Sequence, residues 1–301
     1  MILPRLLCLS GSAVIKIDCP LCGGKNFKDL FYKDEMTVVK CKNCGLIFTN
    51  PQPSQEDLTA HYDRNYYYAP NKDPKDNTRY FDYNARYLKG KEKMRFIEIF
   101  ENLKKLGFRK GKLLDVGCAS GFFVSEATRK GWDARGVEVS KWATDWGKKH
   151  LKVKIEIGEF EKIKLSQNAF DVVTMLDVLE HFQNPQEVLT KSAKILKKDG
   201  IIYVETINFD NWITRYLIGQ KYVHMVPKFH LYYFGRKQLK QLLEKAGFKI
   251  LDSSLWSSSV GDREHFGLDM YWQYLKLLIN PPKGHQNFAL NDLVKIYAQK
   301  Q

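Results

Sequence analysis

The chain lacks any long uninterrupted apolar stretch, although 44% of its 301 residues are apolar. No run reaches the roughly 18 apolar residues that a membrane-spanning helix needs, so we expect no transmembrane segment. The apolar start is broken by Pro4 and Arg5 and makes a poor signal peptide. We therefore expect residues 1–17 to form a flexible tail and the protein to be cytoplasmic.

Cysteine is also scarce, and its spacing argues against a disulfide framework. Four of the six cysteines form two C-x-x-C pairs separated by eighteen residues: Cys19, Cys22, Cys41 and Cys44. The gap has room for two short strands, near Phe27–Tyr32 and Thr37–Lys40. This pattern predicts a zinc ribbon at residues 18–52, whose four thiolates would fill the shell of a structural Zn²⁺ ion. A redox role or a metal-free state is the alternative.

Acidic residues are few beside the basic ones: 34 against 48, for a net charge of +14. Such an excess suggests anionic partners, namely nucleic acid, a phosphorylated substrate or a membrane surface. A soluble protein with a basic surface explains the same number equally well. No internal repeat or low-complexity tract is present.

The dinucleotide fingerprint G-x-G-x-x-G is absent, but a related turn is present. Lys112–Val116 reads as a short buried strand, Gly117 and Gly121 form a tight turn, and a helix starts at Phe122. Ala119 replaces the middle glycine, which a ligand without a pyrophosphate tolerates. The second strand ends in Glu138, about twenty residues further on, where a carboxylate can accept hydrogen bonds from ribose hydroxyls.

Three motifs follow one another at matching spacing: Asp115–Gly121, Gly136–Ser140 and Phe170–His181. They resemble the successive motifs of class I S-adenosylmethionine (SAM)-dependent methyltransferases, most of all the branch of the ubiquinone-biosynthesis O-methyltransferases. The resemblance covers roughly residues 112–251. It implies SAM as the cofactor.

The alternation of elements predicts an α/β fold, a parallel sheet with helices on both faces. With the resemblance it implies a Rossmann-like class I methyltransferase fold with a mostly parallel seven-stranded sheet. The expected strands are Lys112–Val116, Asp133–Glu138, Val153–Ile157, Phe170–Leu176, Ile201–Thr206 and Gly247–Leu251. The expected helices are Phe122–Lys130, Lys141–His150, Pro185–Leu196 and Arg236–Ala246.

The resemblance also implies which residues bind the cofactor. The glycine turn would pass beneath its methionine and ribose portions, Glu138 would hold the ribose, and the loop after the third strand would contact the adenine. The tip of the fourth strand would line the methionine end. The full set is Asp115, Gly117, Cys118, Ala119, Gly121, Phe122, Glu138, Val139, Glu159, Phe160, Met175, Leu176 and Asp177. For Glu159 a solvated loop charge, and for Met175 a core position, remain the alternatives.

The segments around this core are harder to interpret. Residues 53–84 are tyrosine-rich and form either a packing linker or a lid over the cofactor that uses Tyr62, Tyr66 and Tyr67. A helix at Ala85–Leu106 should begin the SAM-binding domain, residues 85–256, with its lysines and arginines in solvent and Met94 among its apolar face. Residues 207–234 interrupt the rhythm where the acceptor must bind. Residues 257–301 read as a helical extension, with a helix at Glu264–Leu278 that suits packing or a homodimer.

Three histidines are candidate general bases: His181, which follows Glu180, and His224 and His230 in the insertion. In the resembling enzymes this glutamate–histidine pair lies near the acceptor, and some use a divalent cation. The pattern predicts methyl transfer, to oxygen first, onto a small-molecule or sugar/glycan acceptor that could be phosphorylated. An RNA methyltransferase is the alternative, although an Asn-Pro-Pro-aromatic motif is missing where Asp177–Glu180 stands. A non-catalytic SAM-binding scaffold is the third reading.

Overall fold

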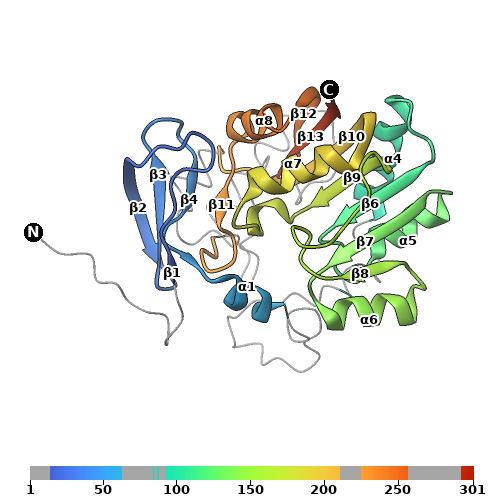
Figure 1. The fold of residues 1–301 in the computed structure, drawn as a ribbon, viewed down its shortest axis with the longest axis horizontal. Helices are drawn as coiled ribbons and strands as arrows, with labels where there is room; N and C mark the ends of the chain where they lie inside the picture. The colour runs from blue at the N-terminus through green and yellow to red at the C-terminus, as the bar shows by residue number, and fades with distance from the viewer. Residues whose placement is uncertain (1–13, 63–83, 85–86, 88–92, 211–224, 257–292) are drawn as a thin grey trace, which may run out of the picture.

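The computed structural model describes residues 14–62, 84, 87, 93–210, 225–256 and 293–301 (Figure 1). These residues form a large sheet with helices on both faces and a smaller sheet at one end of the molecule. The glycine turn and the four cysteines belong to different sheets. The fold is described below only as far as it positions these two sites.

The large sheet has seven strands in the order β12-β13-β10-β9-β6-β7-β8. Its strands are β6 (Lys112–Val116), β7 (Asp133–Glu138), β8 (Ile155–Ile157), β9 (Phe170–Leu176), β10 (Leu196–Ile207), β12 (Phe248–Trp256) and β13 (Leu293–Lys300). Only β13 runs against the others, since it pairs antiparallel with both β10 and β12. This confirms the predicted mostly parallel seven-stranded sheet.

Alternate residues of each strand supply two separate cores, as the two-residue period of a strand requires. Leu113 packs with α4 (Lys93–Lys105) and α5 (Phe122–Arg129), whereas its neighbour Leu114 packs on the side of α7 (Pro185–Ile195) and α8 (Arg236–Lys245). The remaining helix of the sheet, α6 (Lys141–His150), starts where the Ser140 hydroxyl accepts a hydrogen bond from the Ala143 amide. Burial on both faces explains why the central strands read as apolar runs.

The helix α4 corrects one expectation about its faces. Met94 was expected on the apolar face but is 66% exposed. Arg95, expected among the solvated basic side chains, is buried beside Phe96 and Ile99. The buried face of α4 therefore includes Arg95 and leaves out Met94. The carboxylates of Asp177 and Glu205 pair with the Arg95 guanidinium and hold it inside.

The end of the chain corrects another expectation. Residues 293–300, expected within a helical extension, form β13 between β12 and β10. The pattern has a period of two: Val294 and Ile296 enter one core and Tyr297 enters the other. The expected helix at Glu264–Leu278 lies outside the described residues.

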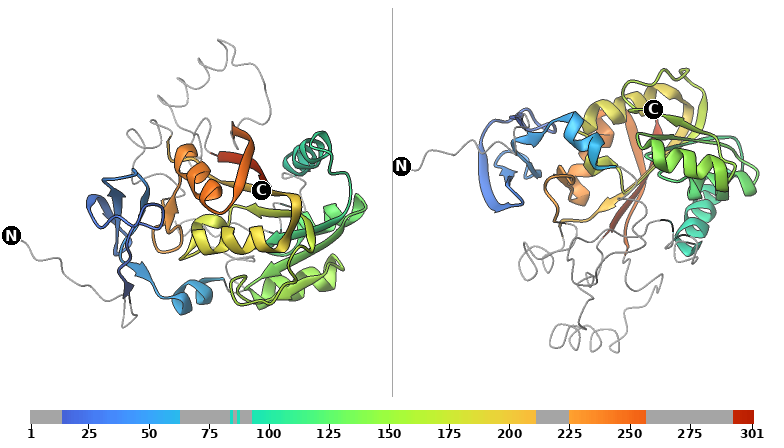
Figure 2. Two further views of the ribbon diagram at one scale, coloured as in Figure 1. Left: turned by 45° about the horizontal axis from the view of Figure 1, so that its top comes forward. Right: turned by 90° about the horizontal axis from the view of Figure 1, so that it is seen from below.

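The smaller sheet contains the cysteine-rich region. It joins β2 (Phe27–Lys33), β3 (Met36–Cys41) and β4 (Ile47–Thr49), and its fourth strand, β11 (Tyr232–Tyr233), comes from the insertion after β10. Figure 2 shows this sheet at the opposite end of the molecule from α5 and α6. The two strands that were expected here are present, but the partnership with β11 was not foreseen.

Two short elements flank the smaller sheet. β1 (Val14–Ile15) pairs antiparallel with β5 (Gln52–Pro53), so part of the expected tail is a strand. α1 (Gln55–His61) follows and opens with Ser54, whose hydroxyl accepts from the Asp57 amide. This helix brings the chain toward the ligand edge of the large sheet.

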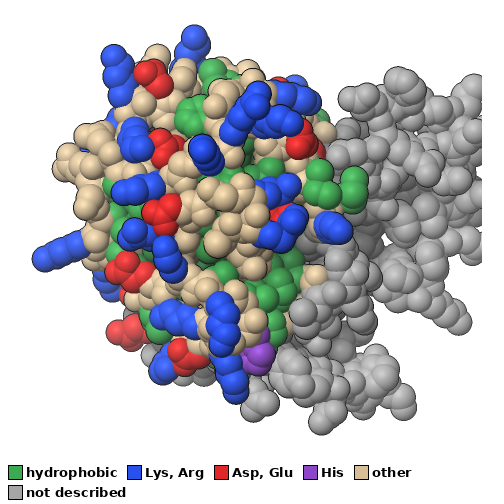
Figure 3. All heavy atoms as spheres, turned by 90° about the vertical axis from the view of Figure 1, so that its right-hand side faces the viewer, with side chains coloured by type: hydrophobic (Ala, Val, Ile, Leu, Met, Phe, Trp, Pro, Cys, Tyr) green, Lys and Arg blue, Asp and Glu red, His purple; other side chains and the backbone are tan. Residues whose placement is uncertain are grey.

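The described helices are all too short or too polar to cross a membrane. Figure 3 shows Lys and Arg side chains spread over one face of the molecule, with Asp and Glu side chains between them. On this face the excess of positive charge is dispersed and does not form one continuous stripe.

Candidate active site

A cleft lies where β6 ends and the chain turns into α5. It is lined by Tyr87, Asp115, Gly117, Cys118, Phe122, Phe123 and Leu176. Five of these seven residues belong to the predicted cofactor set. The cleft opens at the carboxyl ends of parallel strands, the edge at which open α/β sheets bind ligands.

The glycine turn can be built only with small residues. Gly117 has φ +68°, and a Cβ there would lie 2.2 Å from Cγ2 of Val178. Gly121 has φ +78°, and its Cβ would lie 2.8 Å from Val153. Ala119 also takes a left-handed conformation, with φ +50°. The backbone of this turn therefore stays close to the cleft with few side chains in the way.

Glu138 joins the tip of β7 to the turn. One carboxylate oxygen accepts from the Ala119 amide at 2.9 Å and the other accepts from the Ser140 amide at 2.9 Å. A carboxylate oxygen can accept more than one hydrogen bond, which is the property that a ribose ligand requires. The carboxylate thus ties the glycine turn to the end of β7.

Asp115 lies inside the sheet end and lines the cleft. Its carboxylate accepts a 2.6 Å hydrogen bond from Thr174 Oγ1. Burial raises the pKa of Asp115 from 3.8 to about 7, although the Thr174 bond and the positive charge of Arg95 act in the other direction. A carboxylate poised in this way can pair with a cationic ligand group.

The loop after β8 holds the two residues expected at the adenine. Glu159 forms an ion pair with Lys162 at 2.8 Å, which partly satisfies its charge. Phe160 is buried, and Lys191 lies over its ring and donates to its carbonyl oxygen at 2.6 Å. The buried Phe160 ring thus anchors this loop in the hydrophobic core. Val139, half-buried, follows Glu138 on the same edge.

The tip of β9 separates core from cleft. Met175 is fully buried in the core on the α7 side, whereas Leu176 lines the cleft. Asp177 is exposed and receives a hydrogen bond from Arg95 Nη2 at 2.7 Å. Arg95 Nε lies 2.9 Å from the buried carboxylate of Glu205, so the guanidinium bridges two strand ends.

Sequence reasoning missed Arg95 and Tyr87. Arg95 could have been found as a cation among Phe96, Ile99 and Phe100 on the buried face of α4. The Tyr87 ring stacks on Phe122 with centroids 4.8 Å apart, and so covers the start of α5. No signal in the sequence separates Tyr87 from the other tyrosines of its neighbourhood.

The acceptor-side candidates come from two distant segments. Glu180 and His181 lie in the short helix η1 (Leu179–His181) after β9, and the His230 ring meets the His181 ring edge-on at 4.7 Å. His181 Nδ1 is 3.0 Å from the Phe229 carbonyl oxygen and 2.8 Å from the Tyr62 hydroxyl. The structure therefore brings together two of the three predicted histidines, and His224 lies outside the described residues.

The surroundings set the chemical state of this cluster. Because a carbonyl can only accept, the contact with Phe229 requires a proton on His181 Nδ1 and leaves Nε2 as the basic nitrogen. Burial lowers the pKa of His181 from 6.5 to about 4, so the ring is neutral near pH 7. Burial and the Asp177 charge raise the pKa of Glu180 to about 8. Ligand atoms of Glu180, His181 and His230 lie within 4.8 Å of one another, which also suits a divalent cation.

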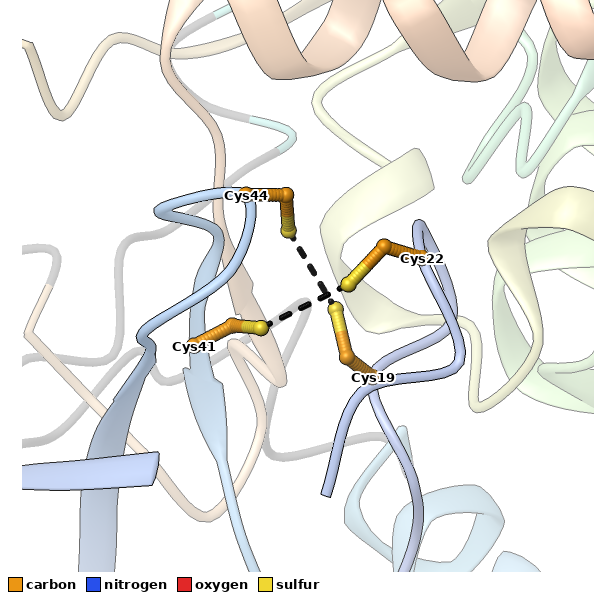
Figure 4. Close-up of side chains that lie close together, drawn as sticks. All are labelled: Cys19, Cys22, Cys41 and Cys44. Atoms are coloured by element: carbon orange, nitrogen blue, oxygen red, sulfur yellow. Dashed lines mark hydrogen bonds between the residues drawn. The ribbon is translucent and has the colours of Figure 1, made fainter. Parts of the chain in front are cut away.

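The four cysteines converge from two turns of the smaller sheet (Figure 4). Sγ of Cys19 lies 3.5 Å from that of Cys44, Sγ of Cys22 lies 3.5 Å from that of Cys41, and all four lie within 4.8 Å of one another. A tetrahedral zinc site with bonds of about 2.3 Å places its sulfurs about 3.8 Å apart. The donor set and its geometry thus fit a closed structural zinc site.

Comparison with known proteins gives the family context of this cleft. A family model described as "Methyltransferase domain" matches residues 86–253. A ubiquinone biosynthesis O-methyltransferase of Coxiella burnetii is 30% identical over 154 residues, 48% of this chain and 66% of that protein. The same enzyme of Dechloromonas aromatica is 31% identical over 39% of this chain and 54% of that protein. The chain thus spans less than two thirds of the length of these relatives.

Solved structures show the same fold at low sequence identity. A SAM-dependent methyltransferase of Thermotoga maritima superposes with a TM-score of 0.51 at 19% identity and covers 73% of this chain and 95% of that one. A chain from the complex of the Haloferax volcanii Trm112 methyltransferase activator with a methyltransferase superposes with a TM-score of 0.53 at 14% identity, with the same coverage. These likenesses show a shared fold.

Proposed function

The chain belongs to the methyltransferase domain family, and on that premise we propose that it transfers a methyl group from SAM to an oxygen of a small-molecule acceptor. The observation that carries the proposal is the cleft at the glycine turn, with Glu138 on one side and His181 at the neighbouring strand end. The names of the curated relatives support oxygen as the acceptor atom.

For the donor, the residues of the cleft divide the work. The bound sulfonium supplies a methyl group with a neutral thioether as leaving group, so no acid is needed to help it depart. The glycine turn leaves room for the ligand, and Glu138 accepts from its ribose hydroxyls. Asp115 offers a carboxylate to its amine, and Leu176 and Phe122 supply apolar walls that exclude water.

For the acceptor, we assign the proton transfer to His181 with His230 beside it. The Nδ1 proton held by Phe229 leaves Nε2 free to take a proton from an acceptor hydroxyl. The Tyr62 hydroxyl contacts the same nitrogen, Nδ1, and helps to fix the ring. A divalent cation on Glu180, His181 and His230 would instead bind the acceptor oxygen and lower its pKa.

The proposal also covers the chemical class of the acceptor. A small phenol or enol agrees with the relatives' names, and a sugar or glycan, phosphorylated or not, suits the basic surface. RNA is the alternative acceptor. The names of the curated relatives favour the small molecule.

Calorimetry with SAM and S-adenosylhomocysteine tests the donor, and release of S-adenosylhomocysteine tests turnover. The acceptor panel should contain dihydroxybenzoates, nucleotide sugars and a structured RNA. We expect micromolar cofactor binding and turnover with the first or second class. If neither cofactor binds, the proposal is wrong. Turnover with RNA alone would leave the donor assignment intact and overturn the acceptor.

A further inference from the structure

The cysteine-rich region is built into the acceptor side of the molecule. Strand β4 pairs with β3 on one edge and with β11 on the other, so the smaller sheet takes its fourth strand from the insertion after β10. Phe48 faces Tyr232 across this join, and their rings stack at 6.2 Å. The join places the ribbon against the segment that carries His230.

Residues 225–234, called here the histidine segment, are held from two sides. On the ribbon side, the Thr49 amide donates to the Leu231 carbonyl at 2.8 Å and the Thr49 hydroxyl donates to the Pro227 carbonyl at 3.1 Å. On the other side, the Leu231 amide donates to the Glu180 carbonyl at 2.9 Å. The Thr49 hydroxyl also lies 3.4 Å from the His230 carbonyl oxygen, and because Thr49 is completely buried, water cannot replace these two carbonyls as partners of the hydroxyl.

The metal site lies close to Thr49 along the chain. Cys41 ends β3 and Cys44 precedes β4, so this ligand pair brackets the turn between the two strands. The Cys41 amide donates to the Leu46 carbonyl at 2.8 Å, which closes the turn. A metal ion that holds both cysteines therefore fixes the direction in which β4 leaves toward Thr49.

The cofactor cleft takes its lining from other parts of the chain. Its lining residues come from residue 87 and from the segments around β6, α5 and β9, and none belongs to residues 14–62. Loss of order in the ribbon should therefore reach the histidines before it reaches the cleft.

We propose that Thr49 is a positioning residue through which the metal-bound ribbon holds His230 and His181 for the acceptor. The proposal rests on the acceptor role assigned to these histidines above. It makes the ribbon part of the acceptor site: metal binding at the four cysteines controls acceptor binding and leaves cofactor binding unchanged.

The first test compares Thr49→Val with Thr49→Ser and with the control Thr37→Val, a half-exposed residue of β3 in the same sheet. Thr49→Val keeps the shape of the side chain and removes its hydrogen bonds, whereas Thr49→Ser keeps a hydroxyl. We expect amide exchange in the histidine segment to rise about tenfold in Thr49→Val, as the loss of one or two buried hydrogen bonds implies. Modification of His230 and His181 by diethyl pyrocarbonate should rise with it.

The other measurements separate positioning from general damage. Zinc content by mass spectrometry and S-adenosylhomocysteine affinity by calorimetry should stay within twofold of the wild type in all three variants. Chelator-treated wild type should show the same change in exchange and histidine reactivity as Thr49→Val, or a larger one, with its S-adenosylhomocysteine affinity retained.

The outcomes are distinct. If Thr49→Val behaves like Thr37→Val, or if Thr49→Ser is as impaired as Thr49→Val, the role of Thr49 is refuted. If chelation weakens cofactor binding as strongly as it frees the histidine segment, the ribbon supports the whole fold and the proposal is wrong. Absence of any cofactor binding by the wild type would refute the proposed function alone, since exchange and histidine reactivity are read without it.

Discussion

Asp115→Asn should change the stability of the protein in a way that depends on pH. Burial raises the pKa of this carboxyl from 3.8 to about 7, so the folded protein binds its proton more tightly than the unfolded chain does. The stability contributed by that proton is complete below pH 3.8 and is lost as the pH rises through 7. Asparagine has no proton to lose and still accepts the hydrogen bond from Thr174.

The magnitude follows from the interval between the two pH values. The stability that the Asp115 proton contributes falls by about 1.36 kcal/mol for each pH unit between pH 5 and the folded pKa of about 7. The wild type therefore loses about two such units of stability between pH 5 and pH 8. The free energy of unfolding of Asp115→Asn, minus that of the wild type, should therefore be about 3 kcal/mol higher at pH 8 than at pH 5.

Urea unfolding followed by circular dichroism at the two pH values measures this difference without a ligand. Thr174→Val is the control: it keeps the carboxyl and removes a hydrogen bond that lowers its pKa, so this variant should keep the pH dependence of the wild type or show a steeper one. Equal differences between Asp115→Asn and the wild type at pH 5 and pH 8 would show that the folded pKa is close to 3.8. Burial would then not govern this carboxyl, and the reasoning would be refuted.

Three further predictions concern the cleft and its neighbours. Gly117→Ala should weaken S-adenosylhomocysteine binding about tenfold or more in calorimetry, because left-handed strain of about 1–2 kcal/mol and the contact with Val178 move the turn; unchanged affinity would contradict the close approach. Arg95→Met should lower the free energy of unfolding by about 3–5 kcal/mol, since the buried carboxylate of Glu205 loses its ion pair with the guanidinium; a loss under 1 kcal/mol would make the bridge unimportant. In ¹⁵N NMR, His181 should stay neutral down to about pH 5, because burial lowers its pKa to about 4; protonation near pH 6.5 would contradict that burial.

The parallel part of the sheet was predictable because its pattern is local. Glycine turns, caps and apolar runs set the limits of β6, α5 and α7 within a few residues of the expected positions. β13 was missed because its alternation, Val294 and Ile296 against Tyr297, is short and follows a segment of different character. Its identity as a strand depends on pairing with Ile201 and its neighbours, about one hundred residues earlier.

The candidate site likewise contains local features, which the sequence predicts, and contacts between distant residues, which it does not. The tight turn at Gly117 and Gly121 was predictable because it depends on the backbone conformation of consecutive residues. The contact between Tyr62 and His181 joins residues 119 apart, and the bond from Thr49 to Pro227 joins residues 178 apart. Nothing in either local sequence specifies such partners, so they emerge only when both sheets are assembled.

The register of β12 and β13 has a consequence for how this architecture can diversify. Trp256 stands opposite Leu293, so the chain leaves the sheet after β12 and re-enters beside its point of departure. Leu293 in turn faces Ile207, at the same rim where β10 ends. Residues 257–292 are thus inserted at a hairpin whose two ends are already neighbours, and closing that gap with a tight turn would cost the sheet no pairing. A change in the length of the chain between Trp256 and Leu293 would therefore leave the pairing of β12 with β13 intact.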